Sequence, residues 1–439
     1  MTTNLEKRYF GLTKYEIFLA LVAFFGWTLV AMDLNIFSDT LPEILNAYHL
    51  PSSDAGLITT AVFIGMFILQ LIMSPLIEIL GRKLMFNITL LGTAIFTGLT
   101  VFATTLGSLI GVRIIADGFS YSEFPAGLTI IQEGIPAKER GSTYGFVQSG
   151  FPVGYFLATL ATLFIVSIGF RYVYLVGIVP AIEVIVARLK VKEPDRYKEY
   201  KKMEELKKEN KSKELEKEVE STSYKVNTHE IGKFQYKQLF DPDLRKQNTV
   251  YTFAEFFHEF STPTFLFFTA VVLEVYKHLP VSESLIILLF GTGIAAPAYY
   301  LAGLIGNHIK HGRKWAAAGS TILGGILSIF FIISTGFIPL LLTYVLFEPI
   351  LLSWNGTIWS YYSETNPTRV RGTAGGFMNT ISTLAWIVSS LLWTIALLTV
   401  GLTVWWIVGG SIVAVISGLI ILIGGKTINP HAELEEISI

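Results

Sequence analysis

The chain has 439 residues, of which 52% are hydrophobic and only 15% carry a charged side chain. Soluble domains carry about 25% charged residues, so this composition indicates a membrane protein and argues against a soluble globular one. The net charge of −1 gives no basis for nucleic-acid binding, and the absence of cysteine excludes disulfides and thiolate metal sites.

Twelve apolar stretches follow one another along the chain, and a membrane-spanning helix needs roughly 20 such residues. The first six lie at 16–38, 55–80, 85–105, 107–134, 142–169 and 171–188. The other six lie at 248–277, 283–306, 315–334, 338–363, 372–399 and 402–424. We therefore expect an all-α membrane protein with twelve transmembrane helices, the first of them retained rather than cleaved as a signal peptide.

Lysine and arginine are concentrated in the loops after the second, fourth, eighth and tenth stretches, which lie on one side of the membrane. These loops contain Arg82, Lys83, Lys138, Arg140, Lys310, Arg313, Lys314, Arg369 and Arg371. The loops on the other side contain only Arg171 and Lys277. Because cytoplasmic loops carry the excess of Lys and Arg, we expect both termini to be cytoplasmic, in a plasma or inner membrane.

One long polar stretch, 191–247, mixes acidic and basic residues densely and contains few apolar ones. This composition is typical of a solvated, partly helical linker, and the alternative is a lipid-binding or regulatory segment. We therefore predict a six-helix bundle at 1–190, a cytoplasmic linker at 191–247, a second six-helix bundle at 248–424 and a cytoplasmic tail at 425–439.

Two motifs occur twice with the same separation of 231 positions. The tripeptide Gly-Arg-Lys at 81–83 recurs at 312–314. The second motif, Glu133, Pro136, Arg140, Gly141, Gly145 and Phe146, recurs as Glu364, Pro367, Arg371, Gly372, Gly376 and Phe377. Two motifs with one offset indicate a parallel, pseudo-twofold repeat of two halves, an arrangement that places a substrate site between the halves near the bilayer midplane.

These repeated motifs resemble those of the major facilitator superfamily over almost the whole chain. That family's loop between helices two and three has a glycine and an acid before Gly-Arg-Arg/Lys. Here Pro75 replaces the glycine and Glu78 supplies the acid, while the second copy has Ile309 in place of the acid. The motif Glu-x-x-Pro-x-x-x-Arg-Gly is present in both halves. The resemblance implies a fold of two six-helix bundles in which helices one, four, seven and ten line a central cavity.

Within the superfamily, the segment GWTLVAMD at 26–33 looks like the first helix of the proton-coupled lactate and sialate transporters. Arg113 and Glu123 in the fourth stretch are similar to the same group. Sugar porters share Gln148 and the spacing of Trp359 to Glu364. The sequence departs from these groups at Val30, which replaces an acid, and at Asp117 and Ser122, which replace glycines. It also lacks the paired glutamines of sugar porters in helix seven.

Ionisable side chains inside an apolar span are costly unless they are paired or face water, so each is a functional candidate. They fall on the first, fourth, seventh and tenth predicted helices. They are Asp33, Arg113, Asp117, Glu123, Glu255, His258, Glu259 and Glu348. Because the resemblance places these helices around the cavity, we expect the eight side chains to contact solute or protons, with helix packing as the alternative for Asp33.

Spacing suggests roles for two groups. Arg113 and Asp117 are four residues apart and can pair directly, either as a functional group or only as an internal salt bridge. Glu255, His258 and Glu259 share one helix face, where crowded carboxyl groups and a histidine can carry protons. Alternatively, helix seven begins late and Glu255 meets cytoplasmic water. A zinc site is not expected there, because only one histidine is available.

Further polar residues are candidates for solute contact or for gating. Gln148, Asn355, Trp359 and Asn379 could hydrogen-bond or stack with solute, or join helices together. Gly145, Gly150 and Gly154 predict close helix approach in the fifth stretch. The expected cytoplasmic gate consists of Glu78, Arg82, Glu133, Arg140, Arg313, Glu364 and Arg371.

The sequence contains no nucleophile–base arrangement, phosphate-binding loop or ATP motif, so we expect a gradient-driven transporter rather than an enzyme, without a cofactor. The leading hypothesis is proton-coupled symport of a small polar organic solute, a monocarboxylate or a sugar, by a monomer that uses alternating access. The alternatives are proton-antiport efflux of organic cations or drugs, and a non-transporting receptor with a transporter fold. The expected partners are the solute, protons and the lipid bilayer, and no nucleic acid.

Overall fold

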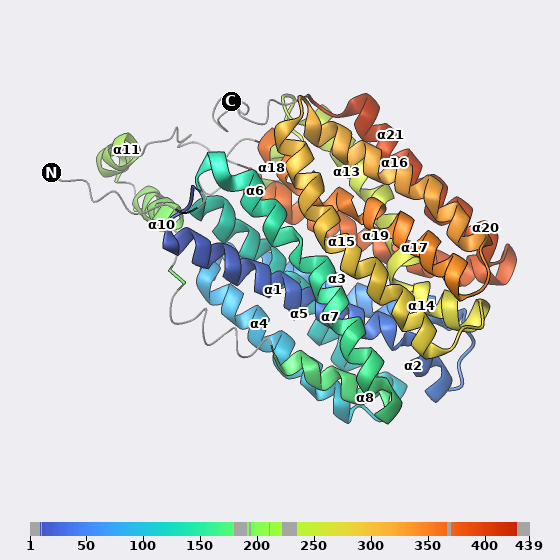
Figure 1. The fold of residues 1–439 in the computed structure, drawn as a ribbon. Helices are drawn as coiled ribbons and strands as arrows, with labels where there is room; N and C mark the ends of the chain where they lie inside the picture. Colours follow the sequence, from blue (N-terminus) through green and yellow to red (C-terminus); the bar gives the residue numbers. More distant parts are fainter. Residues whose placement is uncertain are drawn as a thin grey trace.

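The computed structural model describes residues 9, 11–179, 191–192, 195–209, 211–221, 235–366 and 370–427. Within these residues the regular structure is helical, apart from one isolated bridge between Tyr9 and Leu12. Figure 1 shows two groups of long helices side by side, one from each half of the chain. The first helix begins and the last helix finishes at the same end of this body (Figure 1). We call it the near end and the opposite end the far end.

The amino-terminal half contributes eight α-helices, five of them long. Their bounds are α1 Lys14–Asp39, α2 Leu41–Ala47, α3 Asp54–Leu80, α4 Arg82–Leu99, α5 Leu106–Gly134, α6 Ala137–Gln148, α7 Gly150–Ile165 and α8 Phe170–Val173. Short 3₁₀ turns continue α4, α7 and α8 at η1 Thr100–Phe102, η2 Val166–Ile168 and η3 Tyr174–Ile178. Thr13 caps the amino terminus of α1. Its hydroxyl accepts from the Glu16 amide, while the Glu16 carboxylate accepts from the Thr13 amide.

The carboxy-terminal half repeats the long antiparallel helices. Its α-helices are α13 Arg245–Thr262, α14 Thr269–Val271, α15 Val281–His308, α16 Gly312–Ile333, α17 Phe337–Leu352, α18 Ile358–Thr365, α19 Arg371–Thr399, α20 Leu402–Trp405 and α21 Val413–Gly424. Wider or tighter turns join them at η4 Pro263–Phe267, η5 Val272–Tyr276, η6 Ser353–Gly356 and η7 Trp406–Ile412. The far end carries α2, α8, α14 and α20 (Figure 1).

By length and apolarity, nine helices among the described residues can cross a membrane, and a bent pair, Arg245–Phe267 with Thr269–Tyr276, makes a tenth. The fourth predicted span is α5, a 29-residue helix that is long enough but carries Arg113, Asp117 and Glu123. The sixth predicted span begins in α8 and η3 and continues at 180–190, outside the described residues. Together with α5 and the segment that begins in α8, these ten spans match the twelve predicted helices in order.

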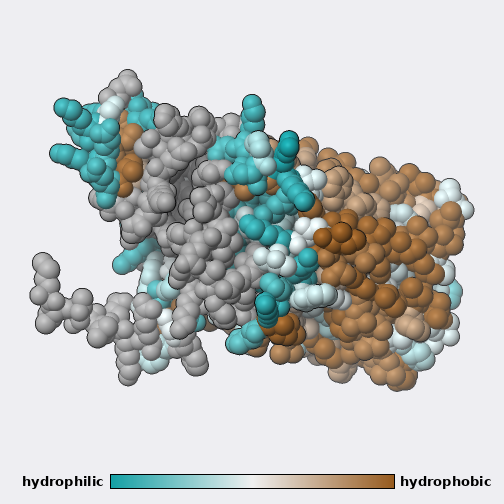
Figure 2. All heavy atoms as spheres, turned by 90° about the horizontal axis from the view of Figure 1, so that it is seen from above, coloured by the Kyte–Doolittle hydropathy of each residue, from teal (hydrophilic) through white to brown (hydrophobic). Residues whose placement is uncertain are grey.

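Hydrophobic atoms cover the helical body, while hydrophilic atoms gather toward one end (Figure 2). Large apolar side chains are strongly exposed on this surface, for example Phe102 at 76% and Ile423 at 84% exposure. A soluble monomer rarely exposes so extensive an apolar surface, whereas a lipid bilayer covers it without cost. The surface therefore agrees with helices that span a membrane.

Three helices form in the segment predicted as the linker: α10 Asp195–Lys208, α11 Ser212–Ser221 and the single turn α12 Gln235–Gln238. Met203 and Leu215 are buried where α10 meets α11. The Lys202 Nζ atom lies 2.6 Å from the Glu218 Oε2 atom and ties the two helices together. The described part of the linker is thus partly helical, as its mixed charge predicts.

Helix seven is broken near its middle. The bend between its two parts is 44°, and it occurs after the π-helical turn η4, which begins at Pro263. Proline has no N–H and crowds the preceding turn, so it commonly bends a helix. Here the amide of Phe268 donates to the Pro263 carbonyl at 2.9 Å, five residues back.

Close contact between α1 and α7 depends on Gly154. A Cβ atom added at Gly154 would lie 2.1 Å from the Thr28 carbonyl oxygen and 2.8 Å from the Ala31 Cβ atom. We therefore expect Gly154→Ala to push the two helices apart and to lower the free energy of unfolding by about 1–3 kcal/mol. Thermal unfolding in detergent measures this change.

The control is Gly111→Ala in α5, because a Cβ at Gly111 would have no other atom within 4 Å. Alanine is the better helix former by up to about 1 kcal/mol, so this variant should be as stable as the parent or slightly more stable. Equal stability of both variants would contradict the close α1–α7 contact.

Candidate functional site

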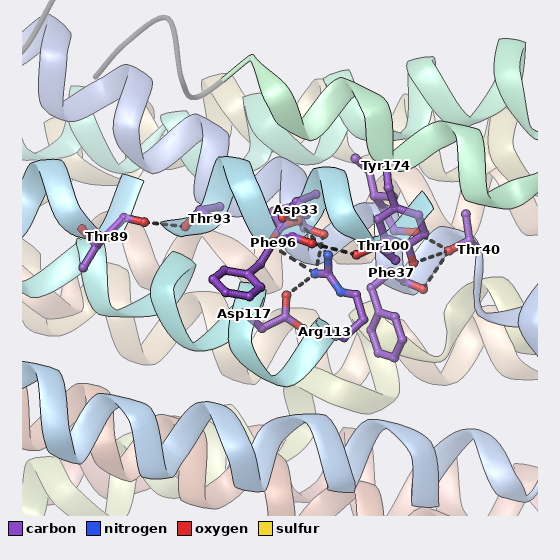
Figure 3. Close-up of polar contacts among 12 residues, drawn as sticks. Asp33, Phe37, Thr40, Thr89, Thr93, Phe96, Thr100, Arg113, Asp117 and Tyr174 are labelled. Carbon is purple, nitrogen blue, oxygen red and sulfur yellow. Dashed lines mark hydrogen bonds and ion pairs between the residues drawn. The ribbon is translucent and has the colours of Figure 1, made fainter. Parts of the chain in front are cut away.

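An arginine and two aspartates form a buried group inside the amino-terminal half (Figure 3). Arg113 in α5 donates from Nη1 to the Asp33 Oδ1 atom at 3.0 Å and from Nη2 to the Oδ2 atom at 3.1 Å. Arg113 also pairs with Asp117, one turn further along α5. Asp33 accepts a further bond from the Thr97 hydroxyl at 2.6 Å. The pair expected from the spacing of Arg113 and Asp117 is present, and Asp33 of α1 joins it.

Aromatic rings surround the guanidinium of this group. Its carbon lies 5.1 Å from the ring centre of Tyr174 and 5.8 Å from that of Phe37, and Figure 3 shows both rings beside Arg113. Arg113 has no exposed surface, and Asp33 is only 1% exposed. All of these partners belong to the amino-terminal half. The structure therefore places Asp33 inside that half, although the sequence predicts that it faces the space between the halves.

Glu123 lies in the same half but away from Arg113. Its side chain is buried, and its Oε1 atom would lie 2.7 Å from a Cβ added at Gly26 of α1. The glycine therefore leaves the room that the carboxyl group occupies between α5 and α1.

Two glutamates on α13 form the second buried group, in the carboxy-terminal half. Glu255 accepts from the Trp354 indole at 3.1 Å and from the Ser382 hydroxyl at 2.9 Å. Glu259 accepts from the Trp386 indole at 2.7 Å. Both carboxyl groups are buried, so helix seven does not begin late: it starts at Arg245, and Glu255 lies well inside it.

His258 shares the helix face with these glutamates but not their hydrogen bonds. Its ring stacks on Trp354 with the ring centres 4.8 Å apart and 17° between the planes. Neither ring nitrogen has a hydrogen-bond partner in the described part of the chain. His258 therefore has a packing contact here, and its predicted part in proton exchange stays a prediction.

Glu348 stands apart from both groups. It lies in α17, fully buried, and its Oε2 atom would lie 3.3 Å from a Cβ added at Gly291 of α15. Neither carboxyl oxygen of Glu348 has a hydrogen-bond partner among the described residues.

Aromatic rings from the two halves contact one another, and we call this contact the junction between the halves. The ring of Tyr121 lies 5.1 Å from that of Trp386, and Phe124 lies 5.0 Å from Trp359 edge-on. Trp27 packs on Phe124 at 4.2 Å behind this contact. Because Trp386 also holds Glu259, the contact joins the amino-terminal half to the glutamates of helix seven.

Amide side chains lie at the same junction. Gln148 donates to the Asn355 carbonyl at 3.4 Å, and the Trp359 indole donates to the Asn355 side-chain oxygen at 3.1 Å. Across another pair of helices, Thr383 donates to Gln70 at 3.1 Å. The Gln148 Oε1, Gln70 Nε2 and Asn379 Oδ1 atoms are buried without a partner in the described residues. Buried polar atoms are normally paired, so these atoms are candidates for contact with a polar solute.

Comparison with known proteins decides the family. Residues 18–390 match the family model described as Major Facilitator Superfamily. The chain belongs to the Major Facilitator Superfamily. It is a multi-pass membrane transporter of small solutes with the twelve-helix fold of that family, and not an enzyme.

Relatives that match this chain carry the names of several solutes. The putative niacin/nicotinamide transporter NiaP of Bacillus subtilis is 25% identical over 81% of this chain and 82% of its own length. The niacin transporter NiaP of Acinetobacter baylyi is 30% identical over 42% of each chain, so the match spans less than half of that relative. A probable 4-methylmuconolactone transporter of Cupriavidus pinatubonensis is 29% identical over 39% of this chain and 41% of its own.

A solved structure agrees in fold. The crystal structure of a D-xylose–proton symporter superposes with a TM-score of 0.69, covering 94% of this chain and 100% of that one. The sequences are 19% identical. This likeness shows the superfamily fold along nearly the whole chain.

The near end of this superfamily member contains the repeated charged motifs. Arg313, which is almost fully buried at the start of α16, pairs with Glu364 at the end of α18. The side chains of the other predicted gate residues, Glu78, Arg82, Glu133, Arg140 and Arg371, lie outside the described residues. For these five residues the expected gate stays a prediction. The observed partner of Glu364 is Arg313 of the Gly-Arg-Lys motif.

The helix-seven glutamates have partners that the sequence analysis missed. Trp386 and Ser382 each lie 127 positions after the glutamate that they contact, as expected where α13 and α19 run parallel with one register. Trp386 and Ser382 are uncharged, so the sequence gives no signal that they contact the glutamates. Only the packing of α13 on α19 reveals these contacts. In the described residues, no three His, Cys, Asp or Glu side chains could hold a metal ion.

Proposed function

We propose that this transporter imports a small polar organic solute, a monocarboxylate or a sugar, together with protons by alternating access. The observation that carries the proposal is the excess of buried carboxyl groups over buried cations. Asp33 and Asp117 share the single guanidinium of Arg113, so the group has one net negative charge when both acids are ionised. One bound proton makes it neutral.

Helix seven contains the second excess of buried carboxyl groups over cations. Glu255 and Glu259 have only neutral hydrogen-bond donors, and no Lys or Arg pairs with them in the described part of the chain. An uncompensated charge inside a membrane protein costs several kcal/mol, so these acids favour bound protons when the halves close over them. Proton uptake and release at both groups can therefore accompany the movement of the two halves.

The junction between the halves suits a solute with a flat face and polar edges. Tyr121, Trp359 and Trp386 offer ring faces, while Gln148 and Asn379 offer unpaired amide atoms. The names of the relatives support this class, because niacin is an aromatic monocarboxylate, and a D-xylose–proton symporter has the same fold. We place the protein in the plasma or inner membrane with the near end cytoplasmic, on the positive-inside rule and the Arg313–Glu364 pair at that end.

A second candidate is proton-antiport efflux of organic cations. The observation that favours it is the position of Glu259 beside the rings of Trp386 and Tyr121. Carboxylates and aromatic faces together attract cations.

The test uses purified protein in proteoliposomes with labelled niacin, nicotinamide and D-xylose as separate probes. Under symport, one of them accumulates when the outside is made acidic. Each 100 mV supplies about 2.3 kcal/mol per proton, or roughly 50-fold accumulation for one proton per solute. Protein-free liposomes under the same gradient are the control, because a neutral weak acid crosses bilayers unaided.

Other outcomes identify the alternatives. An antiporter would take up solute only when the inside is acidic. A uniporter would stop at equal concentrations at every pH, which would remove the proton from the mechanism. Specific binding with no flux of any probe would favour a receptor.

A further inference from the structure

A buried carboxyl group that the site above does not use lies at the last residue of α1. Asp39 is only 2% exposed, and its Oδ2 atom accepts from the Asn35 amide nitrogen at 3.0 Å. The Thr159 hydroxyl of α7 is a second partner of Asp39. The same Asn35 nitrogen lies 2.9 Å from the Thr159 hydroxyl and 3.1 Å from the Tyr155 carbonyl. Asp39 shares none of these partners with Asp33.

The charges that face Asp39 are all acidic or neutral. Glu43 of α2 and Glu274 of η5 both interact with it electrostatically, and so do the phenol groups of Tyr155 in α7 and Tyr344 in α17. No Lys or Arg forms an ion pair with Asp39 in the described ranges. Because a buried carboxylate with neutral donors alone is costly, this arrangement favours a carboxyl group that has bound a proton.

Asp39 lies directly beside the contact that closes the far end. The neighbouring residue, Ser38, donates to the carbonyls of Leu266 and Phe267 in the other half, at 3.1 and 3.0 Å. Two further bonds join the halves at this end: Thr394 donates to the Ser53 carbonyl at 2.7 Å, and the Ser52 and Tyr276 hydroxyls lie 3.0 Å apart. Glu274 and Tyr344, which interact with Asp39 electrostatically, also belong to the other half. The surroundings of Asp39 must therefore change when the far end opens.

We infer that Asp39 is a proton-binding site that controls closure of the far end, separate from the coupling protons of Asp33 and helix seven. Water reaches the carboxyl group when the far end is open, and the ionised form is then stable. Closure buries Asp39 and takes up one proton, which returns to the same side on reopening. The inference rests on the alternating-access part of the proposed function, but not on proton-coupled transport.

The absence of cysteine makes a direct distance measurement simple. Phe102→Cys and Leu398→Cys place one spin label on each half at two exposed far-end positions. We expect the closed population to rise as pH falls, by up to tenfold in the closed-to-open ratio per pH unit for one linked proton. Asp39→Asn, which resembles the protonated acid, should stay closed at every pH.

Three further variants keep the test decisive. Thr159→Val removes a donor that stabilises the ionised carboxylate, so closure should occur at a higher pH. Asp33→Asn should keep the part of the pH dependence that comes from Asp39, because Asp33 bonds to Arg113 and Thr97 and not to the partners of Asp39. Unaltered pH dependence in Asp39→Asn would overturn the inference, and its loss in Glu274→Gln alone would assign the effect to the Glu43–Glu274 pair instead.

An infrared measurement tests the bound proton without any solute. The protonated-carboxyl band at low pH should lose one component in Asp39→Asn and a different one in Asp33→Asn. Identical spectra of Asp39→Asn and the parent would show that Asp39 binds no proton. Because these readouts need no transport, they separate failure of this inference from failure of proton coupling.

Discussion

Asp33→Asn is expected to abolish uphill solute accumulation in proteoliposomes while solute exchange at equilibrium continues. The variant keeps the Arg113–Asp117 pair, so the buried group becomes neutral without a proton. Exchange needs no net proton movement and therefore survives, whereas the roughly 50-fold concentration that one proton supports at 100 mV disappears. Counterflow and gradient-driven uptake of the same labelled solute measure the two activities.

Glu123→Gln tests the same expectation at a carboxyl group that does not contact Arg113. We expect it also to lose accumulation and keep exchange. Gly111→Ala on the exposed face of α5 is the control, because it alters no carboxyl group and should keep both accumulation and exchange. Equal loss of exchange and accumulation in Asp33→Asn would indicate a binding or structural role for Asp33.

Arg113→Gln is expected to lower the free energy of unfolding by about 3–5 kcal/mol, because it leaves two carboxylates buried without a cation. Both Asp33 and Asp117 are almost completely buried, and Thr97 is the remaining donor to Asp33. Denaturant titration in detergent, followed by tryptophan fluorescence, measures the loss.

The control for this prediction is the triple variant Asp33→Asn, Arg113→Gln, Asp117→Asn, which contains no buried charge at this position. It should recover most of the lost stability, since the cost lies in unpaired charge. If single and triple variants are equally unstable, the loss comes instead from the contacts of Arg113 with Tyr174 and Phe37.

The order of spans and the two-half repeat could be predicted because each depends on short segments read alone. A spanning helix is recognisable from a run of about twenty apolar residues. The Arg113–Asp117 pair is recognisable from a spacing of one helical turn. Asp39 was missed because the first apolar stretch ends at residue 38, whereas α1 continues to Asp39. Pro263 was a visible signal for the break in helix seven, since proline inside an apolar span removes a helix hydrogen bond.

Contacts between distant segments could not be predicted in the same way. Asp33 and Arg113 are 80 residues apart, and their pairing depends on how α1 packs against α5. The partners of Glu255 and Glu259 depend on the register of α13 against α19. The sequence therefore predicts which helices carry ionisable groups, but only packing determines that Asp33 and Glu259 belong to separate groups.

The break in helix seven also sets a hydration requirement on opening. At the break, the Leu266 and Phe267 carbonyls accept from Ser38 of the other half. Separation of the halves removes that donor, and water must replace it wherever the carbonyl has no other partner, because an unpaired carbonyl in hydrocarbon costs several kcal/mol. Water must therefore enter the far end as it opens. Dehydrating conditions, such as high concentrations of an excluded osmolyte, should favour the closed state even at constant pH.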